Sequence, residues 1–127
     1  IVYIGAPKAN WLLDNALIDG QSNDVIEGEY GIRAYTGARI ELQQDGEYNV
    51  VELEAAIYGG DQSGVQIKVE YSLDSGASWL VAETITIEAS DLETFRVKLP
   101  EGVKRVAIVL VEAVGRRANF DDIKLMK

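Results

Sequence analysis

The sequence predicts an all-β domain built as an antiparallel β-sandwich of two sheets. About nine short strand-like segments follow one another at intervals of roughly 8–12 residues, with Gly, Asp and Asn at the turns. Within the segments, apolar and polar residues alternate with a period of two, the pattern of a half-buried strand. The sequence has no convincing helical period, and the absence of an internal repeat argues against a propeller.

Strands are predicted along most of the first half of the chain. Residues 1–5 are apolar and predict a short first strand. Residues 10–18 are open to a short helix, although their Asn and Asp content argues against a long one. Residues 31–42 predict a hairpin with its turn at Thr36–Gly37, and residues 51–58 predict the next alternating strand.

The most informative segment is a strand over residues 65–72 followed by a tight turn. In the turn, Asp74 can accept hydrogen bonds from the backbone amides that follow it, and Gly76 can adopt a positive φ without steric cost. The hydroxyls of Ser72 and Ser78 can bond to the turn backbone. These residues predict a hairpin held together by its own side chains, and we interpret Asp74 as a turn residue rather than a ligand for metal or sugar.

The second half of the chain completes the predicted sandwich. Residues 81–87 are rich in β-branched side chains, and residues 94–99 alternate up to Pro100, which predicts the end of that strand. Residues 105–112 are apolar on both faces, which predicts a central strand covered on one side by the core and on the other by a loop or a partner. Residues 118–126 predict the last strand.

Composition limits the function. The 127 residues suit one domain, spanning residues 1–127, and the start at Ile1 without a Met predicts a piece of a larger secreted protein. The chain has no Cys and no His, which removes thiol chemistry and the commonest general base. No apolar run is long enough to span a membrane. The net charge of −9 disfavours nucleic-acid binding by this domain alone, whereas a cation or a neutral glycan stays open as a ligand.

Two resemblances add to this prediction. The spacing Ser72-x-Asp74-x-Gly76-x-Ser78-Trp79 resembles the Asp-box, a structural hairpin of sialidase-like propellers and of bacterial β-sandwiches. Three further segments look like the jelly-roll accessory domains of secreted bacterial proteins, which are similar to carbohydrate-binding modules. These segments are Gly28–Arg33 with Gly37–Ile40, Val51–Tyr58 leading into the Asp-box, and Ala118–Ile123. The resemblance implies a jelly-roll sandwich on the cell surface or outside the cell.

The jelly-roll resemblance also implies a structural Ca²⁺ near the first and last strands. The matching residues here are Asp121 and Asp122, with Glu27, Glu29 or backbone carbonyls as further ligands. Ca²⁺ takes six to eight oxygen ligands, and adjacent strand residues point to opposite faces, so we expect at most one of the two aspartates to bind it. The alternative is that both aspartates are solvated or hydrogen-bonded at a strand end.

A sugar-binding surface needs an aromatic ring to stack on a pyranose and polar groups to hold its hydroxyls. If the strands over 31–42 and 51–58 are neighbours, one polar face unites five candidate ligand residues: Arg33, Tyr35, Glu52, Glu54 and Tyr58. The alternative is a surface of cross-strand packing and weak ion pairs. Trp11 is another candidate ring, although the apolar residues beside it favour a core position.

These observations favour a non-catalytic accessory module that binds carbohydrate. The alternative is a structural or adhesion domain that contacts other proteins or neighbouring domains of the same chain. An enzyme is a third hypothesis, because glycoside hydrolysis needs only two carboxylates and the pairs Glu52 with Glu54 and Asp121 with Asp122 are available. Pairs at this spacing are ordinary on a polar sheet face, so we expect no catalysis.

Overall fold

The computed structural model describes residues 2–3, 11–18, 32–58, 64–111 and 117–126. These residues form nine strands and no helix, and all the strand pairings are antiparallel. The strands are β1 (Val2–Tyr3), β2 (Trp11–Ile18), β3 (Ile32–Leu42), β4 (Tyr48–Ile57), β5 (Val65–Ser72), β6 (Leu80–Ile87), β7 (Glu93–Val103), β8 (Arg105–Leu110) and β9 (Ala118–Met126). The all-β, antiparallel part of the prediction is therefore confirmed, and no helix in the described ranges is long and apolar enough to cross a membrane.

Strand β3 replaces the hairpin predicted over residues 31–42, and that prediction is wrong. The chain bends near Gly37, which has a φ of +77°, but it does not reverse. Residues 32–34 pair with β9, whereas residues 39–41 pair with β8. Because each half of β3 has its own partner strand, a bend satisfies the backbone hydrogen bonds that a hairpin would have paired internally.

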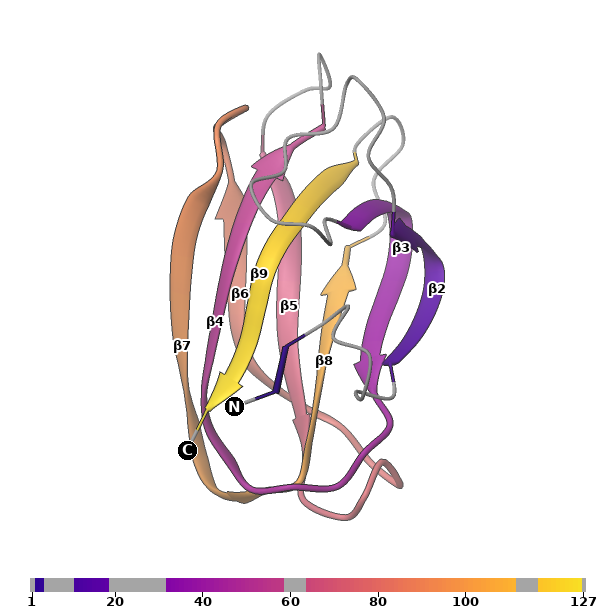
Figure 1. Cartoon of the computed structure of the whole chain (residues 1–127), viewed down its shortest axis with the longest axis vertical. Helices are drawn as coiled ribbons and strands as arrows, with labels where there is room; N and C mark the ends of the chain where they lie inside the picture. The colour runs from indigo at the N-terminus through magenta and orange to yellow at the C-terminus, as the bar shows by residue number, and fades with distance from the viewer. Residues whose placement is uncertain (1, 4–10, 19–31, 59–63, 112–116, 127) are drawn as a thin grey trace.

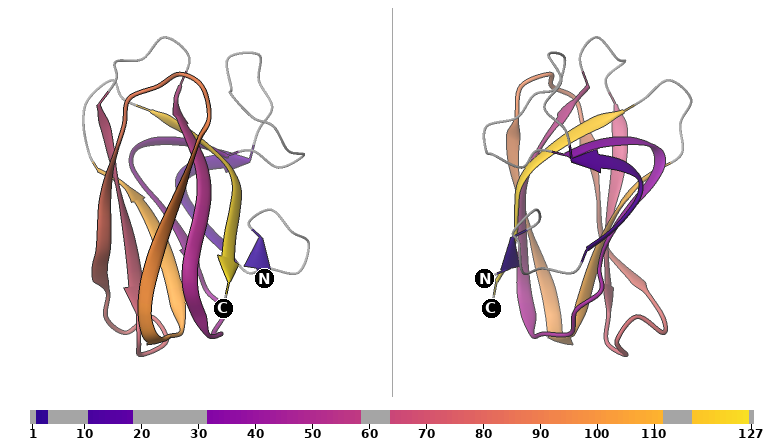
Figure 2. Two further views of the ribbon diagram at one scale, coloured as in Figure 1. Left: turned by 90° about the vertical axis from the view of Figure 1, so that its left-hand side faces the viewer. Right: turned by 45° about the vertical axis from the view of Figure 1, so that its right-hand side comes forward.

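Strand β2 follows β3 through this bend. It pairs with both halves of β3, from Trp11 opposite Leu42 to Ile18 opposite Ile32. The short helix considered for residues 10–18 is therefore absent, because an extended segment can bond to β3 along its length. The ribbon of β2 and β3 crosses from one side of the molecule to the other (Figure 2).

The nine strands form one curled sheet with two flanks that face each other. The order is β6-β5-β8-β3-β9-β4-β7, with β2 beside β3 and β1 beside β9. We call β7, β4, β9 and residues 32–34 of β3 the front flank, and β6, β5, β8 and residues 39–41 of β3 the rear flank. Figure 1 shows β4 and β9 in front of β5 and β6, and β4 contacts β6 across the interior.

Apolar side chains from both flanks fill the space between them. In β4 the residues Val51, Leu53 and Ala55 are fully buried and alternate with half-exposed Glu52 and Glu54, as the period of two predicts. The core is completed by the inward residues of the other strands. The largest fully buried side chains are those of Phe120, Ile32, Ile40, Leu42, Leu53, Ile67, Ile87, Ile108, Leu110, Ile123 and Leu125.

Strands β8 and β9 confirm predictions, and strand β7 corrects a predicted strand end. Strand β8 lies between β5 and β3, so the central position predicted from its apolar faces is confirmed. Strand β9 has the bounds that were predicted. Strand β7 continues past Pro100 to Val103, because β7 is an edge strand and the missing N–H of Pro100 interrupts no central ladder.

Candidate functional site

The outward side of the front flank, here called the front face, carries Arg33, Glu52 and Glu54, while Tyr35 directly follows residues 32–34 of β3 and Tyr58 directly follows β4. The condition set for them, that β3 and β4 be neighbours, is wrong: β9 lies between the two strands. Arg33 of β3 lies opposite Asn119 of β9, which lies opposite Ala56 of β4. The residues of β9 therefore separate Arg33 and Tyr35 from the glutamates of β4.

Three of the five residues form one cluster at the end of the front face. The guanidinium of Arg33 lies over the Tyr58 ring, with Cζ 4.9 Å from the ring centroid, and the guanidinium of Arg117 lies 4.2 Å from the same centroid. Arg33 Nη1 donates a 2.9 Å hydrogen bond to the hydroxyl of Tyr35. Tyr58 and Arg33 are buried, whereas Tyr35 is half-buried. Tyr35 is therefore the accessible ring of this cluster.

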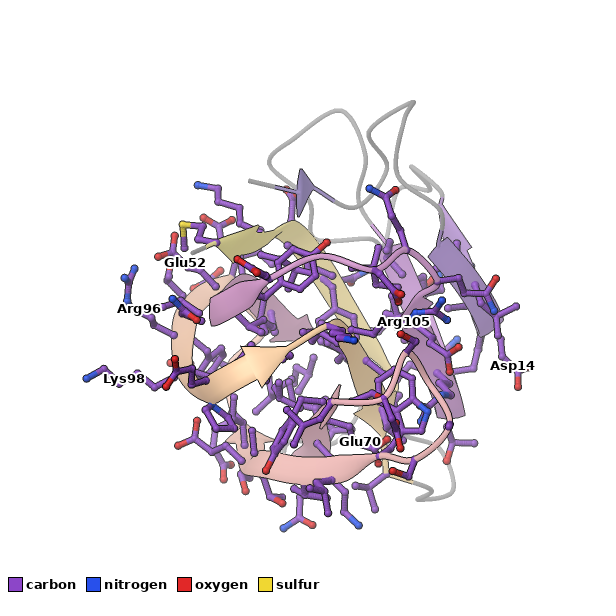
Figure 3. The ribbon with its side chains drawn as sticks, turned by 90° about the horizontal axis from the view of Figure 1, so that it is seen from below. Asp14, Glu52, Glu70, Arg96, Lys98 and Arg105 are labelled. Carbon is purple, nitrogen blue, oxygen red and sulfur yellow. The ribbon has the colours of Figure 1, made fainter. Side chains whose placement is uncertain are left out.

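Glu52 occupies the other end of the front face, and Glu54 lies between Glu52 and the middle of that face. Glu52 forms a 3.0 Å ion pair with Arg96 of β7 and a 3.8 Å ion pair with Lys124 of β9. Figure 3 shows Glu52 and Arg96 on the same side of the molecule, with Lys98 projecting away from the ribbon beside them. Glu54 lies opposite Asp121 of β9. The ion pairs of Glu52 reach solvent at this end, whereas Oε2 of Glu54 is buried.

The middle of the front face is covered. Asn119 and Ala56 are 0% exposed and Asp121 is 2% exposed, although all three lie on the outward side of their strands. The front face is therefore accessible near Tyr35 and near Glu52, but not between them. The sequence could not show this, because alternation indicates which side a residue faces and not what covers that side.

Of the two candidate calcium ligands, the structure describes the side chain of Asp121 but not that of Asp122. Asp121 is buried on the front face and lies opposite Glu54 in the strand pairing, so the two carboxylates are on the same side of the sheet. The side chain of Asp122 lies outside what the structure describes, as do Glu27 and Glu29. Among the described residues no three His, Cys, Asp or Glu side chains gather in a group that could hold a metal.

The turn over residues 72–79 is closed by its own side chains. Asp74 Oδ1 accepts hydrogen bonds from Ser72 Oγ at 2.7 Å and from the Ser78 amide at 2.9 Å, and Oδ2 accepts one from Ser78 Oγ at 2.6 Å. Ser72 Oγ accepts the Gly76 amide at 2.8 Å, and Gly76 has a φ of +90°. The hydrogen bonds from Ser78 and Ser72 lower the pKa of Asp74 to about 2. Asp74 thus acts in this structure as the turn residue that the sequence predicted.

This hairpin is also bonded to the loop between β3 and β4. Asp45 accepts a 2.7 Å hydrogen bond from Ser75 Oγ and another of 2.7 Å from Arg105 Nε. Both contacts lower the pKa of Asp45, the bond from Ser75 first. Asp45 therefore joins the hairpin to the start of β8. The sequence gives no sign of this role of Asp45, because partners 30 and 60 positions away leave no local pattern.

Trp79 follows the hairpin and lies over the outward side of the rear flank, here called the rear face. The Arg39 guanidinium carbon is 4.7 Å from the Trp79 ring centroid. Arg39 in turn donates 2.8 Å hydrogen bonds to Glu41 of its own strand and to Glu70 of β5. Because β8 lies between β3 and β5, the Arg39 side chain must cross β8, where Ala107 is 0% exposed. Arg39 and Trp79 thus cover the outward side of β8, where the apolar residues of that strand had predicted a covering element.

The front and rear faces point in opposite directions. In Figure 3 Glu52 and Arg96 project from one side of the molecule, and Asp14 of β2 projects from the other. Asp14 lies opposite Arg39 in the β2–β3 pairing, which places it on the rear face. A pocket of about 270 Å³ lies apart from the predicted carboxylate pairs and is lined by Glu47, Tyr48, Asn49, Glu101 and Gly102.

The fold is shared with an adhesin domain and with carbohydrate-binding modules of known structure. The K2 cleaved adhesin domain of Lys-gingipain matches with a TM-score of 0.68 and 13% identity, over 99% of this chain and 88% of that one. A family 29 carbohydrate-binding module matches with a TM-score of 0.64 and 11% identity, over 91% of this chain and 75% of that one. At these identities the likeness is one of fold.

A further matched structure carries a sugar. It is a variant of the module CBM29-2 in complex with cellulohexaose, with a TM-score of 0.64 and 10% identity, over 91% of this chain and 78% of that one. No protein-family model matches the sequence, and no curated protein matches it either. The chain thus has the β-sandwich-like fold of carbohydrate-binding modules and of an adhesin domain.

Proposed function

We propose that this chain is a non-catalytic binding module of an extracellular multidomain protein and that its ligand is a carbohydrate. The observation that carries the proposal is the fold, which matches carbohydrate-binding modules over 91% of the chain. The chemistry of the accessible surface is compatible with it, because both faces carry an aromatic ring beside hydrogen-bonding side chains. The net charge of −9 favours a neutral ligand over a polyanion.

On the front face, Tyr35 is the proposed stacking ring. Arg33 donates a 2.9 Å hydrogen bond to the Tyr35 hydroxyl, and the Arg33 guanidinium packs on the ring of Tyr58. Glu52 is the proposed hydroxyl acceptor at the other end, while Glu54 lies closer to the covered middle, opposite Asp121. Tyr58 directly follows β4 and lies six positions after Glu52, which is roughly 20 Å at the rise of an extended strand. A single sugar cannot bridge the two ends, so the proposed ligand is an extended chain.

The proposal is tested with a thermal melt of the chain against soluble polysaccharides, combined with affinity electrophoresis. A ligand that binds only the folded state raises the midpoint by mass action. We expect a rise with at least one neutral polysaccharide, and the variant Tyr35→Ala to lose part of it if the front face binds. The proposal is wrong if no polysaccharide shifts either the midpoint or the electrophoretic mobility.

We propose in addition that Asp121 binds a structural Ca²⁺. Its buried carboxylate lies opposite that of Glu54, and two hard oxygen donors on adjacent strands are a suitable start for such a site. The fit is partial, because Ca²⁺ needs six to eight oxygens. Further ligands would have to come from backbone carbonyls, water or residues such as Glu27 and Glu29, which lie outside the described ranges.

A protein-contact role is the second candidate function, and the sheet edge formed by β6 favours it. On the edge strand β6, Leu80 and Val81 are 54% and 49% exposed, and the strand contains no Lys and no Pro. The other edge strand, β7, carries Arg96, Lys98 and Pro100, which discourage the addition of a further strand. The proposed occupant of the β6 edge is an extended protein segment that pairs as an extra strand.

This second role is distinguished by the variant Val81→Lys. Lysine on an exposed edge opposes strand addition. If the domain acts through β6, Val81→Lys abolishes capture of a protein partner or self-association in sedimentation experiments and leaves polysaccharide binding unchanged. If partner capture and self-association are the same in the variant and the native chain, the β6 edge is not the contact.

A further inference from the structure

We propose that the rear face is a second glycan-contact surface, with Trp79 as its stacking ring and Glu41, Lys68 and Glu70 as its hydroxyl-binding side chains. This inference rests on the proposed carbohydrate-binding function. It assigns a ligand role to residues that the sequence motif explains only as parts of a hairpin.

The first argument is accessibility. Arg39, Glu41, Lys68, Glu70 and Trp79 are all partly exposed, and Val109 of the central strand β8 is partly exposed between them. Ala107 of the same strand is 0% exposed, as Asn119 and Ala56 are on the front face, so the open part of the rear face lies at Val109. A chain of sugars can therefore contact the rear face along the row formed by Arg39, Val109 and Lys68.

The second argument is that the ring is held in place before any ligand arrives. One contact of the Trp79 ring is the guanidinium of Arg39, and that guanidinium is fixed by 2.8 Å bonds to Glu41 and Glu70. On its other side the hairpin is bonded to Asp45 through Ser75. A ring whose orientation is already set loses little conformational freedom on binding, which favours affinity.

The third argument concerns the charge of the ligand. Arg39 beside the ring is paired with Glu41 and Glu70, and Arg105, which lies near Gly76 of the same hairpin, is paired with Asp45 at 2.7 Å. Paired guanidinium groups leave little net positive charge to attract a phosphate or a carboxylate. The remaining lone pairs of the carboxylates can accept hydrogen bonds from sugar hydroxyls, and the ammonium group of Lys68 can donate hydrogen bonds to them. The ligand class that fits is a neutral pyranose chain.

The test uses the full chain labelled with ¹⁵N and titrated with hydroxyethylcellulose, glucomannan and soluble xylan. The indole N–H resonance of Trp79 is assigned with the variant Trp79→Phe. We expect this resonance to shift saturably with one of the polysaccharides. We also expect Trp79→Ala to weaken binding about 2- to 10-fold, as the loss of one aromatic stacking contact predicts.

The control variant is Leu73→Ala, which truncates an exposed side chain of the same hairpin that lies toward Gly102 instead of the rear face. It should bind as the native chain does. The inference is overturned if a polysaccharide raises the melting midpoint while the Trp79 resonance stays in place, a result that leaves the proposed function standing. If no polysaccharide binds, the proposed function fails together with the inference. The resonance of the native chain decides between these outcomes even if Trp79→Ala does not fold.

Discussion

The change Trp79→Ala measures how far the ring supports the fold. Removal of a fully buried aromatic side chain costs about 3–5 kcal/mol. Trp79 is only half-buried, so about half of that loss applies, and it includes a cation–π contact with Arg39 worth about 0.5–1 kcal/mol at such a site. We therefore expect the free energy of unfolding to fall by about 2 kcal/mol, which leaves a domain of ordinary stability folded.

Urea denaturation followed by circular dichroism is the assay. With a slope of about 1–3 kcal/mol per molar urea, a loss of about 2 kcal/mol moves the midpoint down by about 1 M without changing the slope. The matched control Leu73→Ala removes an exposed side chain from the same hairpin and should change the free energy of unfolding by less than about 0.5 kcal/mol.

Two results would refute this reasoning. A loss below about 0.5 kcal/mol for Trp79→Ala would mean that the ring does not pack on Arg39, whereas a loss above about 4 kcal/mol would mean a fully buried ring with no surface for a ligand. A double-mutant cycle with Arg39→Met isolates the stacking contact, for which we expect a coupling of about 0.5–1 kcal/mol.

Three further predictions follow from single contacts. The pKa of Asp74 is lowered to about 2, so its charge stabilises the folded chain above pH 3.8, and this contribution is lost as the pH falls toward 2. Urea titrations should therefore show that Asp74→Asn lowers the free energy of unfolding at pH 7. The difference between the variant and the native chain should narrow toward pH 2. A Cβ at Gly46 would lie 2.5 Å from Cζ of the buried Tyr48 ring, so thermal melts should show Gly46→Ala destabilised by about 1–3 kcal/mol. If the proposed Ca²⁺ binds, adding it after EDTA treatment raises the melting midpoint of the native chain but not of Asp121→Asn, and an unchanged midpoint of the native chain contradicts the proposal.

Gly37, which is exposed, is a control for the Gly46→Ala prediction, because it separates the cost of backbone strain from the cost of a steric clash. A Cβ at Gly37 would meet nothing within 4 Å, but φ is +77°, so Gly37→Ala costs backbone strain alone, about 1–2 kcal/mol. Gly37→Asn should recover part of this loss, because Asn tolerates positive φ better than Ala. The same replacement at Gly46 should recover nothing, since the ring of Tyr48 blocks any side chain there.

The sequence by itself determined the local features of this protein. A period of two needs only neighbouring residues, so the strands over 65–72 and 118–126 were predicted with their bounds. The turn around Asp74 was equally readable, because its hydrogen bonds join residues at most four positions apart. The all-β class follows from the sum of such segments.

Only the tertiary structure decided which strands are neighbours and which faces stay open. Residues 32–42 look like a hairpin locally, but the distant strands β8 and β9 give each half a partner and turn the segment into one bent strand. The same long-range pairing inserts β9 between Arg33 and Glu52, covers Asp121, and brings Arg39 under Trp79. Alternation along a strand records which side a residue faces; the cover on that side comes from residues tens of positions away, which leave no periodic pattern in the sequence.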